Sequence, residues 1–165
     1  MTPAANVPVA SFQSTKSEGV AIPTRRNPLA GAWRVVVEDF VIETEVGMHA
    51  HEHGSAQKIG IDASLSYSGV PSENARGLID YDVWCTGVTA YLGTKSHTRL
   101  LEMLAVEIAV MSFDRWPALD SVLLLLYKPD ICANARRVGV ELRWTRIDYA
   151  YWKARNLPML SQPIA

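Results

Sequence analysis

The chain has 165 residues, a formal net charge of −1 and a hydrophobic fraction of 48%. This length fits one domain with a real core, and the balanced charge gives no basic field to attract nucleic acid or an anionic membrane. No apolar run is long enough to span a membrane, and the N-terminus lacks a secretory signal pattern. The two cysteines, Cys85 and Cys132, have no partner at a metal-ligand spacing, which favours a reducing, cytoplasmic location.

The first predicted segment, residues 1–30, is rich in Pro, Ser, Thr and Ala, a composition typical of a disordered extension. Two strands follow, at Trp33–Val46 and Gln57–Tyr67, with the polar segment His49–Ser55 between them. The second strand alternates apolar and polar residues, which predicts one buried face and one wet face.

A loop at Ser68–Gly77 leads to a helix for which Asp80 is the expected N-cap. A second helix follows the break at Gly93–Ser96. Its apolar residues run almost all the way round, which predicts burial in the core or in a subunit interface: Leu100, Leu101, Leu104, Ala105, Val106, Ile108, Val110 and Met111.

The last two predicted strands are the continuous apolar run Val122–Tyr127 and the alternating segment Arg137–Trp144. The order ββααββ with short connections predicts an α+β domain, in which two helices cover one face of a four-stranded antiparallel sheet. Because the other face of that sheet needs a cover, we expect a homo-oligomer. The domain is expected over residues 31–146, followed by an aromatic C-terminal tail over 147–165 that packs at an interface.

Lys128 stands at the end of the apolar strand and directly before Pro129. Desolvation there would lower the pKa of its amine and produce a base near neutral pH. Lysine also ends many ordinary strands, and proline stops many ladders, so the position alone does not define a site.

Glu102 is a carboxylate among Leu100, Leu101, Met103 and Leu104, where burial is costly without a partner. One interpretation is a surface ion pair with Arg99, one helical turn earlier. The other is a carboxylate that accepts two parallel N–H bonds from a planar ligand, such as an amino-pyrimidine edge.

Glu52 lies among His49, His51 and His53, whose alternate spacing in an extended segment would suit metal chelation. A polar hairpin loop also accommodates histidines at little cost, and Glu52 then becomes a ligand-facing carboxylate at the rim of a pocket. Tyr81 begins the first helix. It is either an amphipathic tyrosine packed under that helix or an acid that protonates a substrate.

Read together, these positions resemble the dihydroneopterin aldolase family of folate biosynthesis. The resemblance covers about Trp33 to Arg146 and rests on Val46-Gly47 with His51-Glu52 and Gln57-Lys58, Ile79-Asp80-Tyr81, Leu100 to Ala105, Lys128-Pro129 with Asn134-Ala135, and Val138-Gly139-Val140. It implies a tunnelling (T-fold) domain whose sheets join into an oligomeric barrel, a tetramer or an octamer, with sites between neighbouring subunits.

The resemblance also implies a reaction, the retro-aldol cleavage of 7,8-dihydroneopterin to a 6-hydroxymethyl-dihydropterin and glycolaldehyde. Glu102 and the backbone of Leu101 would anchor the pterin, and Glu52 would approach its side-chain hydroxyls. Lys128 would be the acid–base residue, and Tyr81 of a neighbouring subunit would assist protonation. The pterin is its own electron sink, so neither a cofactor nor a metal is expected.

Two other functions remain open at this point. The same site could act as an epimerase of dihydroneopterin or of its triphosphate, although a triphosphate enzyme should carry a basic phosphate pocket and tends to lack the Lys-Pro pair. A non-catalytic oligomer that binds a pterin or a metal would use Glu102 or the histidines and leave Lys128 idle.

Overall fold

The computed structural model describes residues 31–69, 78–129 and 131–160. The predicted N-terminal extension and most of the predicted loop before the first helix lie outside these residues. The described residues form strands β1 (Gly31–Thr44), β2 (Gln57–Gly69), β3 (Leu119–Lys128) and β4 (Val138–Thr145) and helices α1 (Tyr81–Thr94), α2 (Leu101–Arg115) and α3 (Arg146–Leu160). A single 3-10 turn, Ala50–Glu52, lies between β1 and β2.

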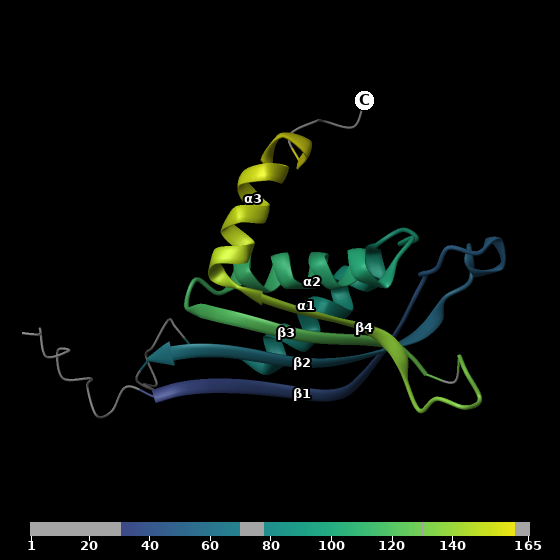
Figure 1. Cartoon of the computed structure of the whole chain (residues 1–165), viewed down its shortest axis with the longest axis horizontal. Helices are drawn as coiled ribbons and strands as arrows, with labels where there is room; N and C mark the ends of the chain where they lie inside the picture. Colours follow the sequence, from purple (N-terminus) through teal and green to yellow (C-terminus); the bar gives the residue numbers. More distant parts are fainter. Residues whose placement is uncertain (1–30, 70–77, 130, 161–165) are drawn as a thin grey trace, which may run out of the picture.

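The four strands form one antiparallel sheet in the order β1-β2-β3-β4, as the sequence predicted (Figure 1). Each strand is hydrogen-bonded to its neighbour in sequence. The β1–β2 and β3–β4 connections are short, which suits antiparallel hairpins, and the helix pair connects β2 to β3. β1 and β4 are the two edges of the sheet.

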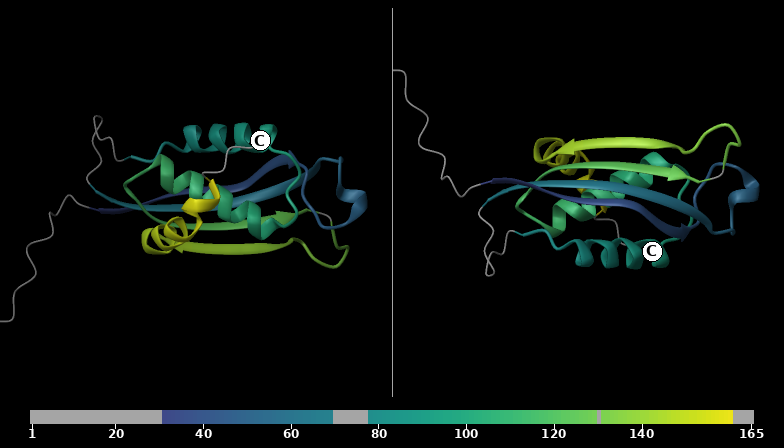
Figure 2. Two further views of the ribbon diagram at one scale, coloured as in Figure 1. Left: turned by 90° about the horizontal axis from the view of Figure 1, so that it is seen from above. Right: turned by 90° about the horizontal axis from the view of Figure 1, so that it is seen from below.

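α1 and α2 cover the same face of the sheet (Figure 2). Four of the apolar positions predicted in β2 are buried, namely Ile59, Ile61, Ala63 and Leu65. Gly60, predicted on the wet face, is buried as well, and Tyr67 is half-buried. Alternate residues of β3 are buried with them. α1 contributes buried residues at helical spacing. Together they form the core: Ile59, Ile61, Leu65, Trp84, Val88, Leu92, Leu104, Ile108, Phe113, Leu124 and Leu126.

Asp80 is the N-cap of α1, which confirms that prediction. Its carboxylate accepts hydrogen bonds from the backbone N–H groups of Asp82, at 2.9 Å, and Val83, at 3.2 Å. The cap satisfies two donors that the first helical turn leaves without partners, so the start of α1 is well defined.

The segment predicted as an aromatic tail contains α3, a helix that the sequence pattern does not predict. Arg146 anchors this helix with hydrogen bonds to the carbonyl oxygens of Phe113 (3.1 Å), Trp116 (2.6 Å), Pro117 (3.0 Å) and Leu119 (3.0 and 2.8 Å). The ring of Tyr149 stacks on Phe113 with centroids 5.0 Å apart. Beyond this anchor, α3 rises away from the sheet (Figure 1).

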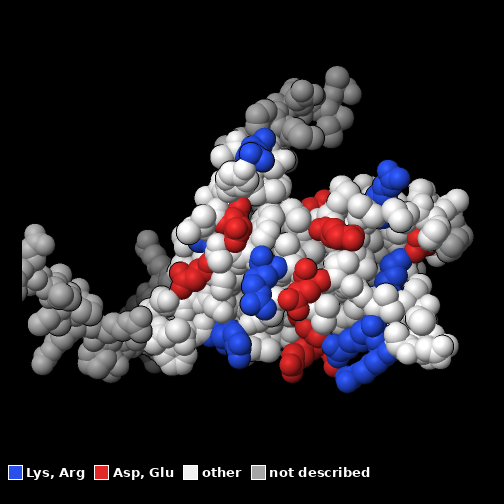
Figure 3. All heavy atoms as spheres, in the orientation of Figure 1, with Lys and Arg blue, Asp and Glu red and all other residues white. Residues whose placement is uncertain are grey.

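Acidic and basic side chains alternate over the face shown in Figure 3, without a large patch of one sign. This distribution agrees with the small net charge of the chain. Within the described residues, no helix combines the length and the apolar character needed to cross a membrane.

Candidate functional site

One pocket of about 350 Å³ lies at the end of the sheet where β3 ends and α2 begins. Three separate segments line it: the loop from Val46 to Glu52, the start of α2 with Arg99 to Glu102, and the β3–β4 region with Lys128 and Val138 to Val140. The fold therefore brings together four of the five predicted site residues, namely Glu52, Leu101, Glu102 and Lys128.

Lys128 and Glu52 form an ion pair inside this pocket. The side chains retain only 14% and 10% of their exposure, respectively, so solvent screens the pair less than it would on an open surface. The Lys128 ammonium also lies 3.4 Å from the carbonyl oxygen of Val46. The sequence predicts both residues in a site but not their direct contact, because 76 positions separate them in the chain.

Glu52 is held as a carboxylate by several donors. The pKa of this group falls from its ordinary value to about 2, mainly through the hydrogen bond from Lys128 and then through the backbone N–H of His49. That N–H donates to Glu52 Oε2 at 3.0 Å, and the side-chain amide of Gln57 donates to Oε1 at 3.3 Å. Glu52 is therefore ionised at neutral pH.

Gly47 makes room for this carboxylate. Its backbone has φ +150°, and a Cβ atom at this position would overlap the carboxyl group of Glu52. The glycine in the Val46-Gly47 motif thus has a steric reason, which the sequence alone did not show.

The loop that carries Glu52 is joined to the segment that leads into α2. The Gly47 N–H donates to the Thr98 carbonyl at 3.0 Å, and the Thr98 N–H donates to the Glu45 carbonyl at 2.9 Å. Val46 and Thr98 form an isolated parallel bridge. These bonds fix the wall with Glu52 relative to the wall with Glu102, and no sequence signal indicated them.

Glu102 is exposed in the first turn of α2 and lines the same pocket. The N-cap residue, Leu100, offers no side-chain hydrogen bond, so backbone N–H groups at this helix start are available to a ligand. Arg99 lines the pocket as well, and among the described residues it forms no ion pair with Glu102. The structure thus does not support the surface ion pair considered above.

Tyr81 is the predicted site residue that the pocket does not contain. It is the first residue of α1 and is 66% exposed. The 14 residues of α1 span about 21 Å and separate it from the segment that leads to Glu102 (Figure 2). Within its own chain, Tyr81 therefore stands at the end of α1 away from the segment that leads into α2.

Among the side chains that the structure describes, no three His, Cys, Asp or Glu groups converge as they would around a metal ion. The side chain of His51 lies outside the described residues. His49 lines the pocket. The ring of His53 instead packs on His97, with centroids 4.2 Å apart, beside the bridge between Val46 and Thr98.

The comparison with protein families gives one match, to the family described as "FolB: Dihydroneopterin aldolase", over residues 35–143. This range contains every predicted site residue and ends before α3. A search of curated proteins gives no match.

Solved structures with this fold include FolB of Vibrio cholerae, with a TM-score of 0.60 and 23% identity over 68% of this chain and 97% of that chain. Escherichia coli dihydroneopterin aldolase in complex with neopterin has a TM-score of 0.56 and 22% identity over 67% and 97%. A Burkholderia dihydroneopterin aldolase bound to guanine has a TM-score of 0.57 and 24% identity over 70% and 92%. These matches establish that the chain shares their ββααββ fold.

Proposed function

We propose, from the premise that the chain belongs to the dihydroneopterin aldolase (FolB) family, that it catalyses the retro-aldol cleavage of dihydroneopterin. The products are a hydroxymethyl-dihydropterin and glycolaldehyde. The observation that carries the proposal is the Lys128–Glu52 pair, which shares one pocket with Glu102.

Glu102 and the start of α2 form a binding site for the flat end of the substrate. An exposed carboxylate can accept two parallel N–H bonds from an amino-pyrimidine edge, and the backbone at Leu101 lies beside it. Neopterin and guanine, which two proteins of the same fold bind, both carry this edge. We infer that the pterin ring lies against Glu102 and that its side chain extends toward Glu52 and Lys128.

The reaction then needs one proton removed and one proton added. The base is Lys128 as its neutral amine, the form that can accept a proton. Directly or through a water molecule, it takes the proton of the hydroxyl group on the departing carbon, and that oxygen becomes the carbonyl of glycolaldehyde. The electrons of the broken carbon–carbon bond move into the pterin ring. The carbon left on the ring is then protonated, which completes the hydroxymethyl product. Glu52 holds Lys128 in place and approaches the same hydroxyl groups.

Tyr81 joins this scheme from a second copy of the chain. Its exposure and its distance along α1 from the pocket both favour a role across a subunit boundary. We therefore propose a homo-oligomer, a tetramer or an octamer, in which Tyr81 of one copy assists the protonation step in the pocket of its neighbour.

The direct test incubates chelator-treated protein with dihydroneopterin and measures glycolaldehyde. We expect release without added metal. Folded protein that releases none would contradict the aldolase proposal. The same assay with both side-chain epimers separates aldolase from epimerase, because an epimerase interconverts the epimers and releases little aldehyde.

Two substitutions assign the roles. Lys128→Ala should abolish turnover and keep pterin binding, whereas Glu102→Ala should lose pterin binding. Lys58→Ala, at an exposed position of β2, is the control and should change neither. Normal binding and turnover in both site variants would show that the roles are wrong.

A further inference from the structure

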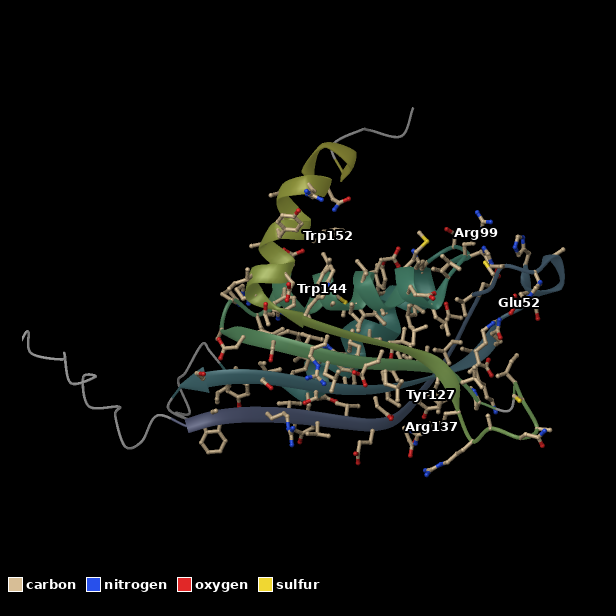
Figure 4. The ribbon with its side chains drawn as sticks, viewed as in Figure 1. Glu52, Arg99, Tyr127, Arg137, Trp144 and Trp152 are labelled. Carbon is tan, nitrogen blue, oxygen red and sulfur yellow. The ribbon has the colours of Figure 1, made fainter. Side chains whose placement is uncertain are left out.

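Directly behind Lys128, on the sheet face opposite the helices, four side chains join all four strands. We call them the four-strand clamp: Asp39 of β1, Asp62 of β2, Tyr127 of β3 and Arg137, the residue before β4. Figure 4 labels two of its members, Tyr127 and Arg137, which lie next to one another at the same end of the sheet as Glu52. None of the four lines the pocket.

Arg137 is the centre of the clamp. Its guanidinium forms ion pairs with the carboxylates of Asp39 and Asp62, and it lies over the ring of Tyr127 at 4.5 Å from the centroid. The Tyr127 hydroxyl donates to Asp39 Oδ1 at 2.8 Å. A guanidinium suits this geometry, because it is planar and permanently charged and can pair with two carboxylates while its face lies on an aromatic ring.

The backbone is shaped to admit this cluster. Asp39 has a left-handed φ of 52°, at the bulge between Val37 and Phe40, and its N–H donates to Asp62 Oδ1 at 2.7 Å. Gly60 is paired with Tyr127, and a Cβ atom on Gly60 would overlap the tyrosine ring. A non-glycine residue at positive φ persists only where its surroundings determine the conformation, and here they do so through the clamp.

The clamp and the pocket use adjacent residues of the same strands. Tyr127 precedes Lys128, and alternate residues of a strand point to opposite faces, so fixing Tyr127 fixes the backbone from which the lysine projects. Arg137 precedes Val138, which is the register partner of Lys128 and lines the pocket. Tyr127 and Arg137 are therefore each the chain neighbour of a residue that lines the pocket.

We propose that Tyr127, Arg137 and Asp39 are positioning residues that hold Lys128 against Glu52. This inference rests on the proposed function for its consequence in catalysis, but the positioning itself can be measured without turnover. The clamp touches no substrate. It acts by fixing the end of β3 and the start of β4, and the site lysine then has one direction in which to project.

The first experiment measures how fast an amine-reactive acylating reagent labels Lys128, followed by peptide mass spectrometry. Lys95 is an internal reference, since it is similarly shielded, at 19% side-chain exposure, and is also paired with a glutamate, Glu107. In Arg137→Gln and in Tyr127→Phe we expect Lys128 to be labelled at least about threefold faster while Lys95 is unchanged. The control, Arg143→Gln, removes an exposed pair with Glu141 at 3.8 Å and should alter neither lysine.

A labelling rate of Lys128 that stays at the wild-type value would overturn the proposal. Equal acceleration of Lys128 and Lys95 would also overturn it, because it would show general loosening of the fold.

The second experiment compares turnover with pterin affinity in the same variants. We expect kcat to fall about 10- to 100-fold, because a small displacement of a reacting group is costly, while the dissociation constant of the pterin product stays within about twofold. Arg137→Lys should have a higher kcat than Arg137→Gln, because the lysine keeps the positive charge. If the wild-type protein releases no glycolaldehyde, the proposed function is wrong. The labelling rates would still show whether the clamp residues position Lys128. Parallel loss of affinity and turnover would show a structural role and overturn the positioning role.

Discussion

Gly47 and Glu52 lie so close together that a methyl group on the glycine would occupy the space of the carboxylate. The two residues belong to the same short loop, which Gly47 also ties to Thr98. Because Gly47 has no side chain, the Glu52 carboxylate can occupy this space and pair with Lys128.

The first prediction follows from this contact. Gly47→Ala should displace Glu52 from Lys128 and lower kcat by about 10-fold or more, because the pair would lose its geometry. Steady-state kinetics and circular dichroism would check it. Gly87→Ala is the matched control: it lies inside α1 with open space around it and should stabilise the helix by about 0.5–1 kcal/mol without changing turnover. Normal kinetics in Gly47→Ala would contradict the geometry.

The second prediction concerns the sharing of the site between copies. Lys128→Ala and Tyr81→Phe should each be weakly active or inactive alone, and joint refolding of the two variants should recover activity. A mixed assembly contains some pockets with an intact lysine from one copy and an intact tyrosine from the other. Size-exclusion chromatography with light scattering gives the assembly size. If the mixture is no more active than the separate variants, Tyr81 does not act across a subunit boundary.

The third prediction concerns pH. The pKa of Glu52 is lowered to about 2 in the folded chain from a value of 4.5. In that window the unfolded chain binds more protons than the folded chain, so the stabilising contribution of Glu52 is complete above about pH 4.5 and declines as the pH falls toward 2. Urea unfolding at a series of pH values should show a smaller acid loss in Glu52→Gln than in the wild type. Identical pH profiles of the two proteins would mean that folding does not lower the pKa of Glu52.

The fourth prediction concerns the anchor of α3. Arg146→Ala removes the donor group that satisfies the carbonyls at the end of α2, and it should destabilise the protein by about 2–4 kcal/mol. Arg146→Lys should recover part of this loss, since one ammonium cannot reach every carbonyl that the guanidinium reaches. Urea unfolding measures the change. Pterin affinity of the folded protein should persist, because Arg146 lies at the end of the sheet away from the pocket, where β3 begins.

Much of the fold could be predicted from local patterns. The alternation in Gln57–Tyr67, the continuous apolar run Val122–Tyr127 and the cap at Asp80 each depend on neighbouring residues, and each is found in the structure. α3 was missed because its position depends on distant contacts, those of Arg146 with the end of α2 and of Tyr149 with Phe113.

By itself, the sequence determined which residues could carry chemistry. Lys128 stands out at the end of an apolar strand, Glu102 among the apolar residues of a helix, and Glu52 in a polar loop between two strands. Only the tertiary structure decided which of them meet. The Lys128–Glu52 pair, the bridge between Val46 and Thr98 and the four-strand clamp all join residues far apart in the chain. Such contacts follow from sheet register and loop packing, which no local pattern encodes, and the same reason leaves Tyr81 outside the pocket of its own chain.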